Sequence, residues 1–318
     1  MTSAPNPRVI KPKMPKTRSI TIVTGIAGLL ALSGCASTAG TSSSSASATS
    51  AVNAEVCGSG TLPTLTEGTL TVGTDKPAYP PYFEDDDPSN GKGFESAVAY
   101  AVAGKLGYAT EDVKWVVVPF NKSYAPGNKD FDFDINQISI TPKRAEAVTF
   151  SEGYYTVNQA VVALNDSPIA NATTVDELKT AKLGAQVGTT SLAFIQDVVQ
   201  PEAEPMVYND TNDAKSALEA GQIDGIVVDL PTAYYVTAVE FDDAKIVGQF
   251  KAQGDAEQFG LLMQKGSALQ PCVDWAISEL EASGELQKIQ DQWLAGENAP
   301  YFKEEGAAST EPSASASS

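Results

Sequence analysis

Apolar and polar residues alternate in the middle of the chain in a pattern that predicts a strand followed directly by a helix. Phe131, Phe133 and Ile135 alternate with acidic residues, which is the period of a half-buried strand. The period changes at Thr141-Pro142, where Thr is a favourable N-cap and Pro is tolerated at the first helical position. We therefore expect a strand over residues 131–140 and a helix immediately after it.

Arg144 falls in the first turn of that helix, where the helix dipole disfavours a cation. A guanidinium beside free backbone N–H groups and the Ser139 hydroxyl makes a site for a small anion, most simply a carboxylate. The alternative is a solvated surface arginine, and this stretch alone does not decide between the two.

Two blocks of the chain repeat this alternation of short β-type runs with helical patterns. The expected strands are 70–74, 114–120, 131–140, 183–187 and 225–228, and the expected helices are 95–106, 175–180, 192–199, 214–220, 273–280 and 285–294. Strands that alternate with helices predict parallel-type sheets, hence an α/β fold with one sheet in each block. Two extended runs, 159–164 and 258–263, lie between the blocks, so we expect a two-segment hinge that joins two lobes.

Several polar residues lie where an expected strand ends, which is where open α/β sheets bind their ligands. Asp75 and Asp229 each follow a strand, and Gly188-Thr189-Thr190-Ser191 forms a strand–turn–helix junction. That junction places hydroxyls beside free backbone N–H groups, although a plain N-cap explains it better when it is taken alone. Asp229 could receive an ammonium group, while Arg144 and Thr190 could receive a carboxylate. Together these groups describe a site for an α-amino acid.

Composition narrows the chemistry that the protein can perform. The 318-residue chain has a formal charge of −19 and contains no histidine. An acidic surface repels nucleic acid, so no nucleic-acid partner is expected. Without histidine the chain lacks the commonest general base, the commonest metal ligand and any Ser-His or Cys-His nucleophile. We therefore expect no catalytic residue, no metal and no cofactor.

The first 35 residues have the features of a targeting segment. A basic region ends at Arg18, an apolar run covers residues 20–32, and Leu32-Ser33-Gly34-Cys35 follows. The apolar run is too short for a comfortable transmembrane helix. Its last four residues resemble the lipobox of bacterial lipoproteins, which implies cleavage before Cys35, lipid modification of Cys35, and a location at the extracellular face of the cell membrane. An ordinary signal peptide or a membrane anchor is the alternative.

Cys57 and Cys272 remain after such cleavage. An even pair outside the cytosol indicates one disulfide, and two unpaired buried thiols are the alternative. Closing so long a loop would stabilise the fold by up to about 4–5 kcal/mol in the chain-entropy model.

Low-complexity segments flank the expected globular region. Residues 36–54 are almost entirely Ser, Ala, Thr and Gly, and the tail is similar. The expected organisation is a signal peptide at 1–35, a flexible tether at 36–60, a first lobe at 61–157 and 258–302, a second lobe at 158–257, and a disordered tail at 303–318.

The order and spacing of short motifs over about residues 65–300 resemble family 3, the polar amino-acid-binding group, of extracellular solute-binding proteins. The matching motifs are Val72-Gly73-Thr74-Asp75, Tyr79-Pro80-Pro81, Gly93-Phe94-Glu95, Ser139–Arg144, Phe150-Ser151, Tyr154-Tyr155, Gly188-Thr189-Thr190, and Gly221–Asp224 with Asp229. The resemblance implies a two-lobed fold of the periplasmic-binding-protein type II class whose lobes close over a ligand. It also implies that this protein is a receptor that delivers the ligand to the permease of an ABC importer. We expect the receptor to be a monomer.

The resemblance implies a clamp for the α-amino-acid part of the ligand. Arg144 and Ser139 would bind the α-carboxylate, with help from the backbone at Thr189 and Thr190. Asp229 would bind the α-ammonium.

The resemblance also implies a pocket for the ligand side chain, where this chain departs from the family pattern. Tyr79 would stack on the side chain and Asp75 would lie near its polar end, while Asn136-Gln137 stands where small residues often stand. Asp75 and the lack of a second cation in the expected cleft favour a cationic or amide side chain over a dicarboxylic ligand. The complete set of expected substrate contacts is Asp75, Tyr79, Gln137, Ser139, Arg144, Thr189, Thr190 and Asp229.

Two other functions use the same fold, and fold alone does not decide function. One is an enzyme of the dehydratase or lytic type, with Asp75 or Glu95 as acid or base; the other is a surface sensor without transport. Because no paired carboxylates, metal ligands or activated nucleophile can be placed from the sequence, we expect a receptor that is not an enzyme. The sequence does not specify which amino acid is bound.

Overall fold

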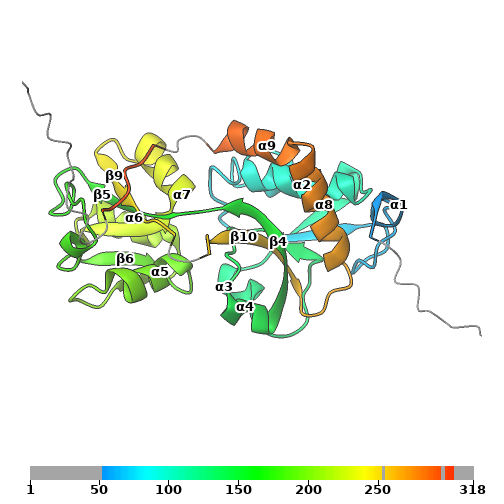
Figure 1. The fold of residues 1–318 in the computed structure, drawn as a ribbon, viewed down its shortest axis with the longest axis horizontal. Coiled ribbons are helices and arrows are strands. Elements are labelled where there is room, and N and C mark those ends of the chain that lie inside the picture. Colours follow the sequence, from blue (N-terminus) through cyan, green and yellow to red (C-terminus); the bar gives the residue numbers. More distant parts are fainter. Residues whose placement is uncertain (1–51, 253–254, 295–297, 304–318) are drawn as a thin grey trace, which may run out of the picture. The chain divides into compact units, whose positions relative to one another are not determined.

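The computed structural model describes residues 52–252, 255–294 and 298–303 (Figure 1). The predicted lipidation site Cys35, most of the predicted tether and the predicted tail from residue 304 lie outside the described residues. In the part of the chain that the structure describes, no helix combines the length and apolar character that crossing a membrane requires.

The first sheet contains five strands in the order β2-β1-β3-β10-β4. Its strands are β1 (Leu70–Thr74), β2 (Val113–Val117), β3 (Phe133–Asp134), β4 (Val148–Thr156) and β10 (Gln258–Gln264). β1 pairs in parallel with β2 and β3, whereas β10 pairs antiparallel with β3 and β4. The carboxyl ends of β1 and β3 therefore lie at one edge, from which Asp75 and the segment leading to Ser139 emerge.

The second sheet also contains five strands, in the order β7-β6-β8-β5-β9. Its strands are β5 (Gln159–Leu164), β6 (Leu183–Gln186), β7 (Met206–Tyr208), β8 (Gly225–Asp229) and β9 (Ala244–Gln249). β6 pairs in parallel with β7 and β8, and β5 pairs antiparallel with β8 and β9. The predicted α/β fold with two sheets is confirmed, and both sheets are mixed because β5 and β10 enter them from the other lobe.

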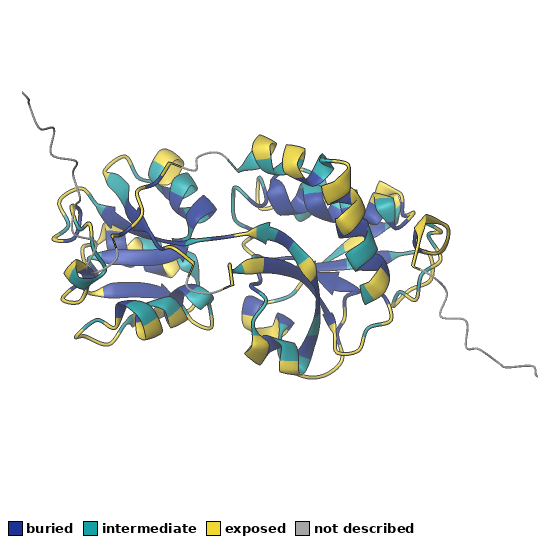
Figure 2. Ribbon diagram, viewed as in Figure 1, coloured by how far each residue is buried: buried dark blue, intermediate teal, exposed yellow. Residues whose placement is uncertain are grey.

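Helices cover both faces of the first sheet (Figure 1). The helices α2 (Phe94–Lys105), α8 (Gln270–Ala282) and α9 (Glu285–Trp293) contact one another on one face, and α3 (Phe120–Ser123) and α4 (Pro142–Ala147) cover the other. On β10, Phe259, Leu261 and Met263 are buried in the core under α2, α8 and α9. Leu262 is buried in the core under α3 and α4, on the opposite face of the same sheet. This alternation follows from the period of two along a strand, and Figure 2 shows the strands mainly buried.

The second sheet is covered in the same way by α5 (Thr190–Phe194) on one face and by α6 (Thr211–Glu219) and α7 (Leu230–Tyr235) on the other. Val161 and Ala163 of β5 belong to the core under α5, while Ala160 and Val162 belong to the core under α6 and α7. α5 and α7 continue into π-helical turns at Ile195–Val199 and Val236–Glu240.

Two segments join a strand of one sheet directly to a strand of the other. Residues 157–158 join β4 to β5, and residues 250–257 join β9 to β10. They are hydrogen-bonded to each other, because the N–H of Val157 donates to the carbonyl of Glu257 (2.9 Å). This contact places Glu257 next to the start of β5.

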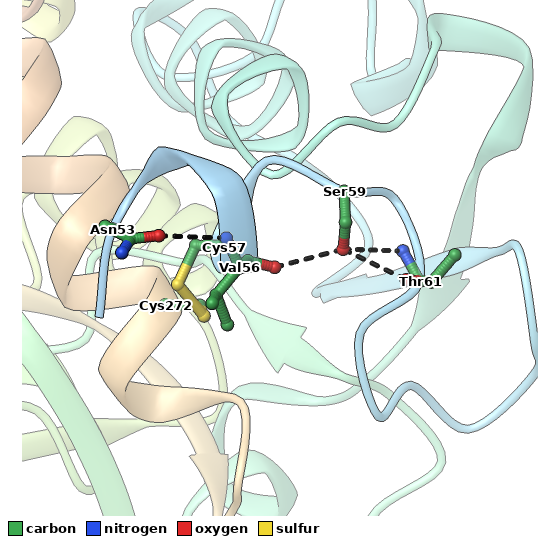
Figure 3. Close-up of a disulfide and its surroundings, with 6 residues drawn as sticks. All are labelled: Asn53, Val56, Cys57, Ser59, Thr61 and Cys272. Carbon is green, nitrogen blue, oxygen red and sulfur yellow. Dashed lines mark hydrogen bonds between the residues drawn. A yellow bond between two sulfur atoms is a disulfide. The ribbon is translucent and has the colours of Figure 1, made fainter. Parts of the chain in front are cut away.

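Cys57 and Cys272 form a disulfide, as predicted (Figure 3). Cys57 ends the short helix α1 (Ala54–Cys57), and Cys272 lies in the first turn of α8. Asn53 caps α1 by accepting a hydrogen bond from the N–H of Val56 (3.1 Å). The predicted tether over 36–60 is therefore wrong for its last residues, because a helix and a covalent link hold them against the first lobe.

The predicted strand over 131–140 is much shorter in the structure. Only Phe133–Asp134 pair as β3, because Gln137 takes a left-handed conformation (φ 48°) that breaks the extended run. The helix predicted after it is confirmed: α4 begins at Pro142, and the Thr141 hydroxyl accepts a hydrogen bond from the N–H of Arg144 (3.2 Å). The strands β4, β7 and β9 were not predicted.

Residues 298–303 pack against the second sheet, whereas the sequence led us to assign residues up to 302 to the first lobe. The N–H of Gln249 donates to the carbonyl of Pro300 (2.8 Å), and the N–H of Phe302 donates to the carbonyl of Gln249 (3.0 Å). The buried ring of Phe302 lies 4.9 Å from the ring of Phe250, centroid to centroid. Burial of this aromatic ring explains why the segment returns to the second lobe.

Removing the disulfide is expected to lower the free energy of unfolding by about 2–5 kcal/mol, because the link restricts a long loop of the unfolded chain. The measurement is denaturant unfolding of the Cys57→Ala/Cys272→Ala double variant against the wild type. Reductant should destabilise the wild type and leave the double variant unchanged. Equal stability of the two proteins would contradict this prediction.

Candidate functional site

Residues from both sheets line one cleft. The cleft occupies about 870 Å³ when the part open to solvent is included. Six of the eight predicted contacts line it: Asp75, Tyr79, Gln137, Thr189, Thr190 and Asp229. The other two, Ser139 and Arg144, lie behind this lining, with the Ser139 hydroxyl 3.3 Å from the hydroxyl of Thr190.

Arg144 is buried, with 8% of its surface exposed, so it is not a solvated surface arginine. Its Nη1 donates to the carbonyl of Ser139 (2.7 Å), and its Nη2 donates to the carbonyl of Gly188 on the second lobe (3.0 Å). The rings of Phe120 and Tyr124 face the guanidinium, with centroids 5.4 Å and 4.8 Å from Cζ. Burial lowers the pKa of Arg144. Two of the guanidinium N–H groups therefore donate to carbonyl oxygens, one from each lobe.

Gln159 and Glu257, which the sequence analysis did not identify, connect Ser139 to Asp229. The Ser139 hydroxyl donates to the Glu257 carboxylate (2.5 Å), and the Gln159 amide donates to the carboxylates of Glu257 (3.1 Å) and Asp229 (2.7 Å). The Ser191 hydroxyl donates to the Gln159 carbonyl (2.7 Å). A glutamine at the start of an otherwise apolar strand is a signal that could have identified Gln159. Glu257 carries no such signal, because it lies in a connecting segment.

Asp229 ends β8 and lies close to charges of both signs. Burial raises the pKa of Asp229 to about 8, and repulsion from the Glu257 carboxylate adds to the rise. The Gln159 hydrogen bond and the Arg144 charge act in the opposite direction. One guanidinium therefore acts electrostatically on two carboxylates, Asp229 and Glu257.

Asp75 and Thr189 hold backbone groups at the edges of the cleft. The Asp75 carboxylate accepts a hydrogen bond from the N–H of Phe120 (3.0 Å). The Thr189 hydroxyl accepts from the N–H of Leu192 (3.1 Å) and donates to the carbonyl of Gln186 (2.8 Å). Thr189 is thus the N-cap of α5, the simpler of the two readings of this junction.

Gln137 is held in the cleft wall by the buried carboxylate of Glu95. The N–H of Gln137 donates to this carboxylate (2.7 Å), and the Gln137 amide group and the Tyr154 hydroxyl donate to it as well. Burial raises the pKa of Glu95 to about 7, although these hydrogen bonds oppose the rise. Glu95 therefore fixes Gln137 from behind, which accounts for the left-handed backbone at that residue.

Lys215 and Glu240 also line the cleft and form an ion pair (Nζ to Oε2 2.7 Å). Lys215 is the single cationic side chain among the described residues that line the cleft. The sequence-based premise that the cleft lacks a second cation beside Arg144 is therefore wrong. Thr211, Ala214 and Lys215 share one face of α6 by helical spacing, but the sequence does not show which face meets the cleft.

Residues 70–296 match the family described as bacterial extracellular solute-binding proteins, family 3. The chain belongs to this family. The match covers most of the chain and both sheets, so it confirms the resemblance drawn from the motifs.

Curated relatives of this family 3 protein differ in the solutes that they are named for. The arginine-binding extracellular protein ArtP of Bacillus subtilis (strain 168) is 28% identical over 241 residues, which cover 72% of this chain and 87% of ArtP. The L-cystine-binding protein TcyJ of Escherichia coli (strain K12) is 27% identical over 233 residues, covering 72% of this chain and 84% of TcyJ.

A solved structure shares the fold. It is that of the ancestral amino acid-binding protein AncCDT-1, described as a precursor of cyclohexadienyl dehydratase. The TM-score is 0.59 at 27% identity, covering 71% of this chain and 95% of that one. The likeness supports the predicted type II periplasmic-binding-protein fold.

Raising the pH is expected to lower the free energy of unfolding, because Asp229 and Glu95 must then ionise in buried surroundings. Their folded pKa values of about 8 and about 7 lie above the values of about 4 in the unfolded chain. The stability that they contribute is fully present below about pH 4 and is lost as the pH rises through 7 and 8. We expect a fall of more than about 1 kcal/mol between pH 6 and pH 9, measured by denaturant unfolding.

Asp229→Asn should reduce this fall, because the variant keeps an acceptor for Gln159 but cannot ionise. Asp130→Asn changes an exposed acid that does not line the cleft and serves as the matched control. A profile that is flat with pH, or equally steep in Asp229→Asn, would show that Asp229 does not titrate as described.

Proposed function

We propose that this protein binds a polar amino acid between its two lobes and delivers it to an ABC importer, from a lipid anchor at the extracellular face of the cell membrane. One observation carries the proposal: Arg144, a buried guanidinium from the first lobe, and Asp229, a strand-end carboxylate from the second, lie close enough to act on each other electrostatically. An α-amino acid carries the complementary pair of charges. Family membership and the names of the relatives support the same class of solute.

The α-carboxylate binds at Ser139 and Arg144, next to Thr190. Support comes from Glu257, because the Ser139 hydroxyl already holds a carboxylate of this chain at 2.5 Å. Arg144 donates two hydrogen bonds to carbonyls, and a guanidinium has five N–H donors, so donors remain for a ligand. The ligand carboxylate takes the place of the Glu257 carboxylate, which withdraws along its connecting segment.

The α-ammonium binds to Asp229. A ligand ammonium favours the ionised form of this carboxylate and lowers its pKa, so binding is coupled to loss of a proton near neutral pH. Because Arg144 and Ser139 belong to the first lobe and Asp229 and Thr190 to the second, a ligand that touches both sets favours the closed arrangement. An importer permease can then distinguish the loaded receptor from the unloaded one.

The ligand side chain lies among Asp75, Tyr79 and Gln137. The sequence favoured a cationic or amide side chain, partly on the premise that the cleft has no second cation. That premise is wrong, because Lys215 lines the cleft. Asp75 still favours a hydrogen-bond donor on the ligand side chain. The relatives named for arginine and for cystine are consistent with a polar side chain of either kind.

The lipobox-like sequence Leu32-Ser33-Gly34-Cys35 supports the proposed anchor. If Cys35 carries the lipid, Cys35→Ser should move the protein from the membrane fraction to the medium, and unchanged fractionation would disprove the anchor.

Arg144→Lys is expected to weaken amino-acid binding by about 10- to 100-fold, because lysine keeps the charge but loses the planar fork that holds a carboxylate. The measurement is titration calorimetry of wild type and variant against the twenty amino acids and L-cystine. Lysine is preferred to alanine in this test, because alanine would strip hydrogen bonds from two buried carbonyls. Lys143→Ala, an exposed cation on the same helix, is the matched control and should bind as the wild type does.

An enzyme on this fold is the competing function, given the likeness to a dehydratase precursor. Incubating the protein with each ligand and following the solution by NMR separates the two. A receptor leaves the ligand unchanged at stoichiometric binding. Catalytic turnover, or full binding by Arg144→Lys, would overturn the proposal.

A further inference from the structure

The cleft contains a second pair of opposite charges, Lys215 and Glu240. Lys215 lies on α6, and Glu240 is the last residue of the π-helical turn after α7. The Lys215 Nζ lies 2.8 Å and 2.7 Å from the two carboxylate oxygens of Glu240. Both side chains line the same cleft as Asp229. Lys215 and Glu240 pair with each other and belong to α6 and the turn after α7, whereas Asp229 ends β8.

A residue of the first lobe faces this pair. The Lys215 Nζ lies 5.6 Å from the centroid of the Tyr79 ring, which is within the range of a cation–π contact. Tyr79 follows β1 and also lines the cleft. Both lobes therefore surround the pair, as both lobes surround Asp229.

The pair is partly shielded from solvent: Lys215 is half-buried, whereas Glu240 as a whole residue is exposed. The Lys215 side chain is 12% exposed and the Glu240 side chain 27% exposed. Fully exposed ion pairs contribute little, whereas a charge that loses its partner in a desolvated site is costly. A ligand that enters here must therefore leave each of the two charges with a partner.

This requirement separates the candidate side chains. A lone guanidinium or ammonium can pair with Glu240 but places a cation beside Lys215, and a lone carboxylate has the reverse effect. An amide offers a donor and an acceptor without charge. A second α-amino-acid group offers a carboxylate to Lys215 and an ammonium to Glu240, so both charges stay matched.

We propose that Lys215 and Glu240 form a second zwitterion-binding subsite, and that the preferred ligand carries an α-amino-acid group at each end, as L-cystine does. This inference rests on the proposed function, because the first α-amino-acid group occupies the Arg144 and Asp229 clamp. Lys215 binds the carboxylate of the second group and Glu240 binds its ammonium. Tyr79 contacts the linker between the two groups.

The test is titration calorimetry of wild type, Lys215→Met and Glu240→Gln with L-cystine, S-methyl-L-cysteine, L-arginine and L-glutamine. S-methyl-L-cysteine keeps the first α-amino-acid group and the sulfur but lacks the second group. Wild type is expected to bind L-cystine about 10- to 100-fold more tightly than S-methyl-L-cysteine. Each variant should lose most of that difference, while its affinity for S-methyl-L-cysteine changes by less than about threefold.

A matched control removes a similar ion pair outside the cleft. Lys105 on α2 pairs with Glu285 on α9 at 3.1 Å, and neither residue lines the cleft. Lys105→Met should leave all four affinities unchanged. Thermal unfolding of each variant shows whether it is folded, and the four ligands measured on the wild type test the inference without any variant.

The outcomes separate this inference from the proposed function. If Lys215→Met lowers the affinity for every ligand by the same factor, the ion pair has a structural role and the inference is overturned. If L-arginine binds the wild type more tightly than L-cystine, the subsite prefers a single cation and the inference is again overturned, although the proposed function stands. If none of the amino acids binds, the proposed function itself fails.

Discussion

The buried guanidinium of Arg144 needs hydrogen-bond partners, and it finds them on both lobes. Burying an unpaired charge would lower the free energy of unfolding by roughly several kcal/mol, so the position of the guanidinium is strongly constrained. The carbonyls of Ser139 and Gly188 meet this need. Because Ser139 follows β3 and Gly188 follows β6, the two bonds fix the ends of strands from different sheets beside one another. The rest of the cleft is organised around that junction.

The same constraint explains the carboxylates around Arg144. Asp229 and Glu257 repel each other, and the Gln159 amide donates a hydrogen bond to each of them. Glu257 belongs to a segment that joins the lobes, so its contact with Ser139 ties the charge arrangement to the hinge. Lys215 and Glu240 repeat the pairing elsewhere in the cleft. A cleft that holds charges of both signs can pair with both ends of a dipolar solute.

The sequence predicted the parts of this protein that depend on local pattern. The Thr141-Pro142 helix start and the paired cysteines have a local or compositional signature, and both are present in the structure. The alternation along 131–135 predicted a half-buried strand, but only Phe133–Asp134 pair, and all five residues are buried, acids included. The sequence did not predict that Gln137 would end β3, because its left-handed backbone depends on the buried carboxylate of Glu95, which is remote in the sequence.

In the candidate site, too, the sequence predicted the residues that follow a local pattern and missed those that depend on tertiary packing. Residues at strand ends, such as Asp75 and Asp229, are recognisable because strand ends of an α/β sheet converge. Three other residues of the site have no such position: Lys215 lies on a helix face, Glu240 at a helix end and Glu257 in a connecting segment. Their place in the cleft depends on how the second lobe packs and on where the chain crosses between lobes. Pattern along the chain carries no information about either.

A crystal structure of the protein with its amino-acid ligand tests the central claim most directly. The account predicts that the ligand α-carboxylate lies within hydrogen-bond distance of the Arg144 guanidinium and the Ser139 hydroxyl, with its ammonium on Asp229 and the Glu257 carboxylate moved away. A ligand bound elsewhere, with Glu257 still on Ser139 and Arg144 bonded to carbonyls alone, would contradict it.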